Sequence, residues 1–377
     1  MSTDPPTTAA SVPWSLDPDE PAGDRRFLAI GDLTLESGAV LPGVVVAYET
    51  WGRLNERADN AVLVEHALTG DSHVVGPAGP GHPTAGWWEG LIGPGAPVDS
   101  DRYFVIATNV LGGCRGTTGP SSPAPDGRPW GSRFPRVTIR DQVAAEAAVA
   151  DLLGIDRWAA VLGGSMGGMR ALEWAVSHPD RVARCLVLAS TAASTADQVA
   201  WCQTQILAIR QDPDFAGGDY YGGPTPDAGL GLARRIAHLT YRSESEISSR
   251  FGRRLQAGDP PREDGGRFAV ESYLDHHAHK LTGRFDANSY LVLTEAMNSH
   301  DVGRGRGGVA QALRAVTART VIASVDSDRC YPPRLSVGLA GVLPRARWVS
   351  ISSSQGHDGF LTEPDQVGAI LRDALEG

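Results

Sequence analysis

The chain alternates between short apolar runs and longer segments that carry apolar residues at helical spacing. The apolar runs, each bounded by turn residues, predict buried strands at 44–52, 61–70, 103–113, 158–164 and 185–190. Segments 138–154 and 166–179 predict helices between these runs, with Thr138 as a cap and Gly154 where the first helix should stop. Strands that alternate with helices predict a mostly parallel sheet covered by helices on both faces.

This alternation stops after Thr191 and returns near residue 309. Segment 192–308 is helix-like and polar, with glycine and proline interruptions such as GGDYYGGPTPDAG. Beyond it the pattern predicts a strand, a helix, a strand and a helix, at 320–328, 333–343, 347–353 and from about residue 364. We therefore expect one α/β core, residues 27–191 and 309–377, that is interrupted by a helical lid at 192–308.

Residues 1–26 differ in composition from the rest of the chain. They are acidic and rich in Pro, Ser and Thr, without the basic and apolar regions of a signal peptide, and they predict a flexible arm. No stretch approaches 18 uninterrupted apolar residues, so we expect no membrane span. The four cysteines form no CxxC pair and suit reduced thiols, which favours a cytoplasmic location.

Composition and motif content argue against a nucleic-acid partner and against a bound metal ion. With 41% hydrophobic and 21% charged residues, the chain can bury a sizeable core. Its net charge of −10 argues against a nucleic-acid partner, which would require a basic face. There is no HExxH motif, and the local cluster His276, His277 and His279 has no partnering cysteine, so no metal site is expected.

The strongest chemical signal is the sequence GGSMGG at 163–168, which follows a predicted strand and precedes a predicted helix. It is a G-x-S-x-G motif in the setting that a nucleophilic serine requires, and Ser165 is the candidate nucleophile. Glycines flank the serine because side chains there would collide with neighbouring elements at the sharp turn. The motif and its setting predict an α/β-hydrolase fold with an inserted lid.

A serine nucleophile needs a base, and in this fold the chain order is Ser, then an acid, then His. Only His357 lies in a loop after the last predicted strand and before the last helix. The acid is expected at the end of the preceding strand, where Asp326 and Asp328 are both candidates. Spacing favours Asp328, because it comes later, where the strand should give way to a loop.

Two backbone N–H groups are needed to stabilise the oxyanion of an acyl-transfer reaction. The residue after the nucleophile, Met166, should supply one. The second should come from the loop after an early strand, HALTG at 66–70, where Leu68 is our choice. His66 in this loop is expected to have a structural role.

Several longer segments are more specific than the fold motif. They are HALTGDSHVVGPAGPGHPTAGWWEGLIGPG (66–95), NVLGGCRGTTGPSSPAPDGRPWGSRFPRVTIRDQV (109–143), GGSMGGMRALEWAVSHPDRV (163–182), LARRIAHLTYRS (232–243), LTEAMNSHDVGRGRGG (293–308), SDRCYPP and GHDGF. Together they resemble homoserine O-acetyltransferase of the methionine pathway, in its actinobacterial branch, from about Phe27 to the C-terminus. Cys330 departs from the pattern, since many relatives carry a bulkier apolar residue there.

The resemblance implies roles for individual residues. Ser165 would be the nucleophile, His357 the base and Asp328 the acid that orients it. Arg234 matches the position that binds the homoserine carboxylate, and Asp358 matches the position that holds its amino group. A zwitterion in a dry pocket needs both of its charges paired. Arg235, by contrast, is assigned to a salt bridge on the lid surface.

The resemblance also implies a reaction and an assembly. Acetyl-CoA, a co-substrate rather than a bound cofactor, would acetylate the serine, and L-homoserine would then take up the acetyl group. A homodimer through the lid helices is expected. Succinyl-CoA as donor, L-serine or deacetylcephalosporin C as acceptor, and plain ester hydrolysis remain alternatives that the sequence leaves open.

Overall fold

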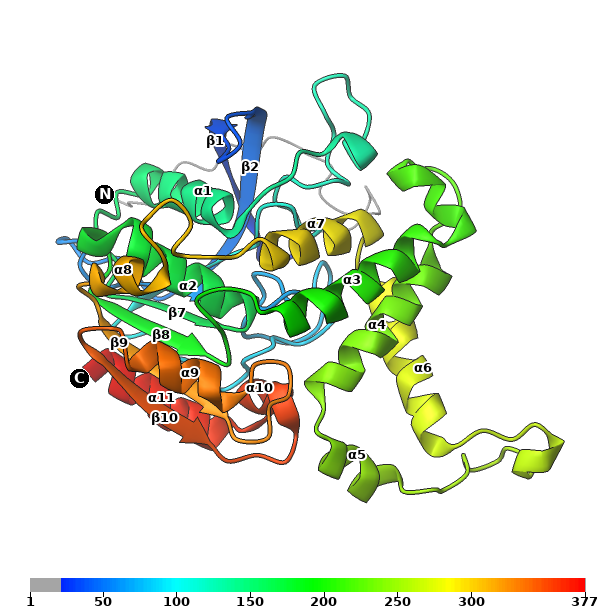
Figure 1. Ribbon diagram of the computed structural model, residues 1–377. Helices are drawn as coiled ribbons and strands as arrows, with labels where there is room; N and C mark the ends of the chain where they lie inside the picture. Colours follow the sequence, from blue (N-terminus) through cyan, green and yellow to red (C-terminus); the bar gives the residue numbers. More distant parts are fainter. Residues whose placement is uncertain (1–21, 377) are drawn as a thin grey trace.

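The structure is a computed structural model that describes residues 22–376. Its centre is an eight-stranded sheet in the order β1-β2-β6-β3-β7-β8-β9-β10 (Figure 1). The strands are Arg26–Thr34 (β1), Val40–Trp51 (β2), Ala61–Glu65 (β3), Phe104–Thr108 (β6), Ala160–Gly164 (β7), Arg184–Leu188 (β8), Arg319–Val325 (β9) and Ala346–Ile351 (β10). The expected N-terminal arm spans residues 1–26. Residues 1–21 lie outside the described residues, and β1 begins at Arg26, the last residue of the expected arm.

The strands from β6 to β10 pair in parallel, whereas β1, β2 and β6 pair antiparallel. The prediction of a mostly parallel sheet is therefore confirmed. Every residue of β3 and β7 is buried, as expected for strands with helices on both faces. Because the parallel strands run in one direction, their carboxyl ends meet at one edge, and the loops that leave this edge carry the candidate site residues.

Helices cover both faces of the sheet. One face packs against α1 (Ile139–Leu152), α2 (Met166–Ser177), α8 (Val309–Arg314) and α9 (Pro333–Ala340). The other face packs against α11 (Pro364–Glu376), near the short α10 (Gly359–Thr362). Thr138 caps α1 as predicted, since its Oγ1 accepts the Asp141 N–H while the Asp141 carboxylate accepts the Thr138 N–H.

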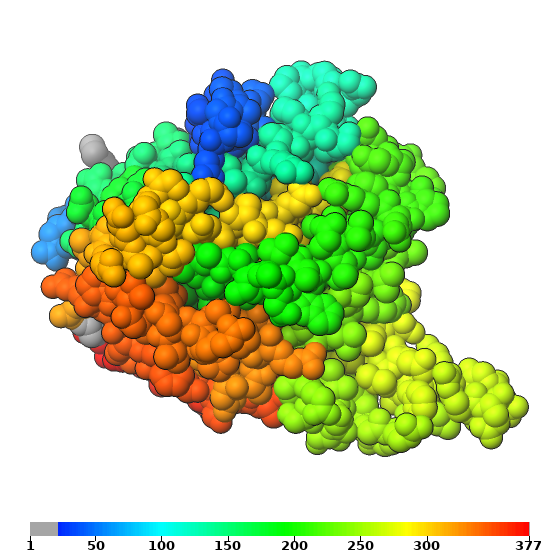
Figure 2. Space-filling view, viewed as in Figure 1, coloured from blue at the N-terminus to red at the C-terminus, as the bar shows by residue number. Residues whose placement is uncertain are grey.

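The chain between β8 and α8 forms a helical insertion. Its helices are α3 (Ala196–Arg210), α4 (Asp227–Tyr241), α5 (Glu244–Phe251), α6 (Ala269–Thr282) and α7 (Ala287–Asn298). The α5–α6 part projects beyond the sheet domain as a separate lobe (Figures 1 and 2). A third apolar cluster joins residues of α3, α4 and α7 to Leu68, Met166 and Met169 of the core. The insertion therefore packs directly over the turn that carries the candidate nucleophile.

The sequence pattern missed several short or edge elements. It gave no prediction for β1, whose residues are mostly exposed or half-buried at the sheet edge. It also missed a two-stranded sheet, Ile92–Gly93 (β4) with Val98–Asp99 (β5). Among the described residues, no helix combines the length and apolar character needed to cross a membrane.

Helix α2 approaches β3 and β7 very closely, and glycines make this possible. A Cβ atom on Gly167 would lie 2.0 Å from the carbonyl oxygen of Glu65, and one on Gly163 would lie 2.2 Å from the carbonyl oxygen of Gly167. Both obstacles are backbone atoms, which cannot rotate away. The glycines of the motif are therefore required by packing as well as by the turn.

We expect Gly167→Ala to lower the free energy of unfolding by about 3 kcal/mol, because α2 must shift away from β3. Urea denaturation of the two proteins measures this difference. Gly338→Ala is the matched control: it lies in α9 with open space around its Cβ position, and we expect it to stabilise the protein by about 0.5–1 kcal/mol. Equal stability of Gly167→Ala and the parent protein would contradict the packing argument.

Candidate active site

Ser165 occupies a strained turn between β7 and α2. Its φ of 58° and ψ of −121° lie outside the regions that non-glycine residues ordinarily adopt. Its N–H donates to the Leu188 carbonyl at 2.9 Å, and its own carbonyl accepts the Ser190 hydroxyl at 2.8 Å. Bonds from β8 and the loop after it therefore hold the turn, so the serine stands at the carboxyl edge of the sheet.

The structure brings Asp328, and not Asp326, against His357. Oδ2 of Asp328 lies 2.7 Å from Nδ1 of His357, while Oδ1 accepts the N–H groups of Cys330 and Tyr331, both at 2.8 Å. Asp326 instead accepts hydrogen bonds from the 352–353 segment, at 3.0 Å and 3.1 Å. Of the two candidates, Asp328 is therefore the one that contacts the imidazole, whereas Asp326 contacts the segment after β10.

The His357 imidazole is buried beside two carboxylates. Burial lowers its pKa, but the charge of Asp328, the hydrogen bond to Asp328 and the more distant charge of Asp358 outweigh that effect, so the pKa lies above its usual value. Tyr331 stacks on the ring with centroids 5.1 Å apart, and Phe360 meets it edge-on at 5.4 Å. These contacts fix the orientation of the ring.

Ser165 and His357 lie at the same edge of the sheet but form no hydrogen bond with each other. Among the described residues, neither the Ser165 hydroxyl nor Nε2 of His357 has a hydrogen-bond partner. Phe360 connects the two regions. It packs against His357, and its ring lies only 2.5 Å from the position that a Cβ atom on Gly164 would occupy. Hydrogen bonds between nucleophile and base commonly form only when substrate is bound.

The two predicted oxyanion donors are available. Within the described part of the chain, the N–H groups of Leu68 and Met166 donate to no other residue. The loop that carries Leu68 is fixed on either side. Nε2 of His66 accepts the Val110 N–H at 3.0 Å, and Arg284 donates to the Thr69 carbonyl at 2.9 Å. Burial, with the nearby Arg170, lowers the pKa of His66 to about 3, so this ring stays neutral, as a structural role requires.

A buried arginine links this loop to the nucleophile helix. Arg170 of α2 donates to the His66 carbonyl at 2.9 Å and lies 2.8 Å from carboxylate oxygens of both Glu65 and Glu146. The Glu146 contact is a hydrogen bond, whereas the Glu65 contact is an ion pair without hydrogen-bond geometry. Burial raises the pKa of Glu65 well above its usual value, which favours its neutral form. One guanidinium then balances one carboxylate.

The residues expected to bind a zwitterion lie on two elements. Arg234 is on α4, where its guanidinium lies 5.5 Å from the centre of the Tyr241 ring and its buried Nε has no hydrogen-bond partner among the described residues. Asp358 follows His357 directly. Burial raises its pKa, against the charges of His357, Arg234 and Arg242. The structure pairs Asp358 with Arg242 at 3.3 Å and records no ion pair between Asp358 and Arg234.

Two residues near this site escaped the sequence analysis. Arg242 bridges Asp358 and Glu246, the latter at 2.8 Å, and Tyr241 faces the His357 ring at 5.7 Å. Both lie within the segment LARRIAHLTYRS that also carries Arg234, and their place in that segment was the available signal. Arg235 forms an ion pair with Asp275 of α6 at 2.7 Å, in agreement with the salt bridge assigned to it.

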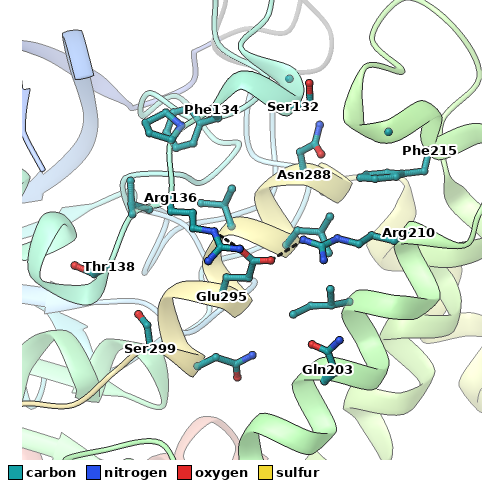
Figure 3. Close-up of a pocket in the computed structure, with 18 residues that line it drawn as sticks. Ser132, Phe134, Arg136, Thr138, Gln203, Arg210, Phe215, Asn288, Glu295 and Ser299 are labelled. Atoms are coloured by element: carbon teal, nitrogen blue, oxygen red, sulfur yellow. Dashed lines mark hydrogen bonds and ion pairs between the residues drawn. The ribbon is translucent and has the colours of Figure 1, made fainter. Parts of the chain in front are cut away.

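A cavity of about 620 Å³ lies elsewhere, among the loop before α1, α3 and α7 (Figure 3). No candidate catalytic or substrate-binding residue lines it. Glu295 on its wall pairs with Arg210 at 2.7 Å and with Arg136 at 3.7 Å (Figure 3). Its charged groups therefore satisfy one another, and the cavity is not part of the site around Ser165.

Comparisons with known proteins identify a matching family model and several similar enzymes. The family model of the alpha/beta hydrolase fold matches residues 60–364. Homoserine O-acetyltransferase of Thermobifida fusca (strain YX) is 65% identical, covering 94% of this chain and 95% of the relative. The same enzyme of Nocardia farcinica (strain IFM 10152) is 57% identical over 100% and 98% of the two chains.

Two solved structures are similar over nearly the whole chain. Homoserine O-acetyltransferase from Bacillus anthracis has a TM-score of 0.87 at 28% identity, with 94% of this chain and 97% of that one covered. Esterase E22 has a TM-score of 0.85 at 28% identity, with 93% and 99% covered. Similar backbones thus accompany both transferase and esterase names, so the choice between these activities depends on site residues.

We expect Asp328→Asn to lower the pKa of His357 below its usual value, because the burial penalty remains while the facing carboxylate is lost. An NMR titration of the His357 ring protons measures this shift. In the parent protein the ring should lose its proton at a higher pH than an ordinary histidine; in the variant it should do so at a lower pH. Asp326→Asn is the control and should leave the titration unchanged. An unshifted His357 titration in Asp328→Asn would refute the pairing.

Proposed function

The chain belongs to the homoserine O-acetyltransferase family of the α/β-hydrolase fold, and we propose that it transfers the acetyl group of acetyl-CoA to the hydroxyl of L-homoserine through an acetyl-enzyme on Ser165. The observation that carries this proposal is the pair of Asp328 and His357, 2.7 Å apart, on the sheet edge where Ser165 is held in a strained turn. This arrangement has the parts that nucleophilic acyl transfer needs.

In the first half-reaction, Nε2 of His357 takes the hydroxyl proton of Ser165 while Oγ attacks the thioester carbonyl carbon. The negative charge that develops on the carbonyl oxygen is stabilised by the N–H groups of Met166 and Leu68. The carbon–sulfur bond then breaks, and His357 returns the proton to the sulfur, which releases CoA as a free thiol. Asp328 stabilises the imidazolium and keeps Nε2 directed at the serine.

In the second half-reaction, His357 takes the proton of the homoserine hydroxyl, and its oxygen attacks the acetyl-serine carbonyl. The same two N–H groups stabilise the second oxyanion. Collapse breaks the bond to Ser165, whose oxygen regains the proton from His357, and O-acetylhomoserine leaves. The scheme uses acetyl-CoA as co-substrate and requires no bound cofactor.

Arg234 and Asp358 are our candidates for binding the acceptor. The buried Nε of Arg234 lacks a hydrogen-bond partner among the described residues, and such a group favours an anionic ligand. Asp358 sits beside the base, where a bound amino group would position the hydroxyl next to Nε2. Burial raises the pKa of this carboxyl above its usual value against the charges of His357, Arg234 and Arg242, and an ammonium group bound beside it would favour its ionised form.

Ester hydrolysis is the second candidate function, because esterase E22 has nearly the same backbone. A hydrolase needs no means of binding a zwitterionic acceptor, whereas the proposed transferase does. Transfer also requires that water be kept from the acetyl-enzyme. The apolar cluster that joins the insertion to Met166 and Leu68 provides such a cover, which supports the role of residues 192–308 as a lid.

We further propose that the lid helices form the contact of a homodimer. Several large apolar side chains are exposed on the two helices α3 and α4, namely Val199, Trp201, Leu207, Leu232 and Leu239. Exposed apolar residues gathered on neighbouring helices are typical of a protein–protein interface.

We expect acetyl-CoA alone to acetylate Ser165, because the first half-reaction needs no acceptor. Intact-protein and peptide mass spectrometry after incubation with acetyl-CoA should show one acetyl group on the peptide that contains Ser165. Ser165→Ala should show none and should lose transferase activity. Ser37→Ala, at an exposed position, should behave as the parent protein. An acetyl group on another residue, or near-full activity of Ser165→Ala, would disprove the nucleophile.

We expect Arg234→Lys to form the acetyl-enzyme at nearly the normal rate but to show a KM for homoserine that is about 10- to 150-fold higher. A lysine cannot reproduce the two parallel hydrogen bonds of a guanidinium, and such a charge-assisted contact contributes about 1.5–3 kcal/mol. Pre-steady-state CoA release and steady-state kinetics separate the two effects. Arg235→Lys, whose partner is Asp275, is the control and should leave both unchanged. Slowed acetylation of Ser165 in Arg234→Lys would show that our assignment is misplaced.

A further inference from the structure

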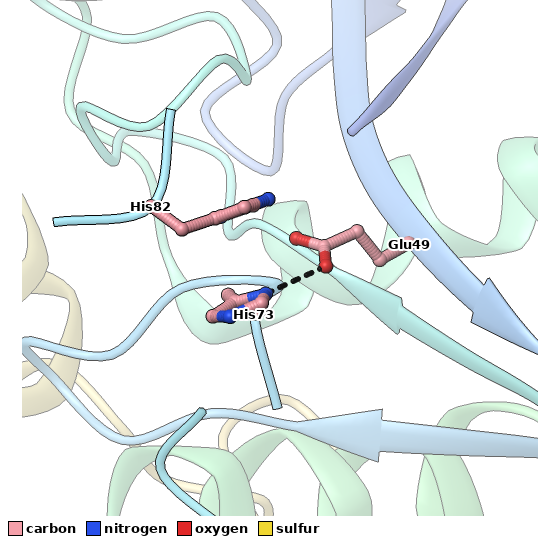
Figure 4. A group of neighbouring side chains, drawn as sticks. All are labelled: Glu49, His73 and His82. Atoms are coloured by element: carbon pink, nitrogen blue, oxygen red, sulfur yellow. Dashed lines mark hydrogen bonds and ion pairs between the residues drawn. The ribbon is translucent and has the colours of Figure 1, made fainter. Parts of the chain in front are cut away.

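A cluster of three metal-ligating side chains lies outside the proposed reaction. Glu49 projects from β2, and His73 and His82 come from the irregular segment between β3 and β4 (Figure 4). Their exposed fractions are 2%, 4% and 6%. Three ligating groups that are removed from water together in this way are uncommon unless they serve a bound ion or a fixed hydrogen-bond network.

The geometry of the cluster suits a cation with a small coordination sphere. One ligand atom of each side chain lies within 4.8 Å of the others, and Nδ1 of His73 lies 3.0 Å from Oε2 of Glu49. The two imidazole rings stack, with centroids 3.8 Å apart and planes 13° from parallel. Coordination therefore requires one local change, a rotation of the rings that makes their lone pairs converge beside the carboxylate.

Neighbouring groups hold His73 and Glu49 as ligands are held in metal sites. Nε2 of His73 faces the Pro77 carbonyl at 3.3 Å, which places the proton on Nε2 and leaves Nδ1 for a metal. The Ser72 hydroxyl donates to Oε1 of Glu49 at 2.8 Å. Nε2 of His82 accepts the Asp24 N–H at 3.0 Å, so in the neutral ring this nitrogen holds the lone pair, and a metal bound there would replace the hydrogen bond to Asp24.

We propose that Glu49, His73 and His82 bind one divalent transition-metal ion, for which Zn²⁺ is the best match. Two imidazoles and one carboxylate form a common zinc ligand set, and a water molecule completes the tetrahedron. Ca²⁺ and Mg²⁺ are poor matches, because both prefer oxygen ligands.

The charges around the cluster are consistent with a dication. The Glu49 carboxylate lies within the cluster, and the Asp71 carboxylate accepts the His73 N–H at 3.0 Å, so two negative groups stand beside the proposed ion. Arg25 is the nearby opposing charge, and its guanidinium donates to the carbonyls of Ala22 and Gly81.

The ion would act as a brace and take no part in acyl transfer. The segment it fixes also carries Trp88, whose Nε1 donates to the Phe360 carbonyl at 3.2 Å, and Phe360 packs against His357. Metal binding would thus join β2, the segment after β3 and the residues behind the base. Because the ion lies outside the reaction, this inference is independent of the proposed function.

This proposal departs from the expectation that the chain has no metal site. That expectation considered only residues close in sequence, in particular His276, His277 and His279. In the structure, His277 stacks on His238 at 4.0 Å, and these histidines belong to no candidate metal-binding group among the described residues. Glu49, His73 and His82 come together only in the fold.

The test uses the full chain after removal of metal by a chelator. Titration with Zn²⁺ alone, followed by isothermal calorimetry and by elemental analysis after desalting, should give one Zn²⁺ per chain and a melting temperature a few degrees higher. X-ray absorption of the zinc-loaded parent protein should show two imidazoles and one carboxylate at about 2.0–2.2 Å. This spectrum requires no variant and so does not depend on how a substitution affects folding.

Two near-isosteric substitutions locate the ion. Glu49→Gln and His82→Gln should each weaken Zn²⁺ binding at least 10-fold, while His276→Gln and His279→Gln, at exposed positions, should leave it unchanged. Absence of stoichiometric binding to the parent protein would overturn the proposal. So would binding that survives both cluster substitutions, or an absorption spectrum with sulfur ligands, since these outcomes place zinc elsewhere.

Discussion

One buried cation, the guanidinium of Arg170, holds together the parts on which the site depends. Through it, α2 is tied to Glu65 at the end of β3, to Glu146 of α1 and to the carbonyl of His66 in the oxyanion loop. No part of the Arg170 side chain reaches solvent. Removing one partner of such a buried pair typically costs about 3–5 kcal/mol, because the remaining charge is left without compensation.

The position of this network explains its importance. Ser165 begins the helix that carries Arg170, and Leu68 lies two residues after the carbonyl that Arg170 binds. The proposed nucleophile, Ser165, and the proposed oxyanion donor, Leu68, are thereby fixed relative to each other through one side chain. The close glycine contacts between α2 and β3 leave room for little adjustment, so the strain at Ser165 is maintained by the packing around it.

The other half of the site depends on the loops after β9 and β10. Asp328 is held by two backbone N–H groups before it contacts His357, and Tyr331 and Phe360 confine the ring. The proposed base is therefore oriented by the sheet core, whereas Arg234 comes from the insertion. If the catalytic chemistry belongs to the core and acceptor binding to the insertion, related folds can serve as transferases or as esterases.

The sequence predicted the features that depend on residues close together in the chain. The GGSMGG turn, the Thr138 cap and the parallel strands followed from spacing and residue type. Spacing favoured Asp328 over Asp326 without settling the choice, because both follow the end of β9 and only the direction of each side chain distinguishes them. The contacts of Arg170 and of the Glu49 cluster were not predicted, since their partners are distant in sequence and meet only in the folded chain. Arg242 was also missed, although one of its partners, Glu246, lies only four residues away.

The central claim, acetyl transfer to L-homoserine, is tested most directly by measuring CoA release for each donor with each acceptor. The donors are acetyl-CoA and succinyl-CoA, and the acceptors are L-homoserine, L-serine, deacetylcephalosporin C and water. Our account predicts by far the fastest release with acetyl-CoA and L-homoserine, together with formation of O-acetylhomoserine. Equal release with and without an acceptor would contradict it and indicate a hydrolase, and faster release with another pair would contradict the proposed substrates.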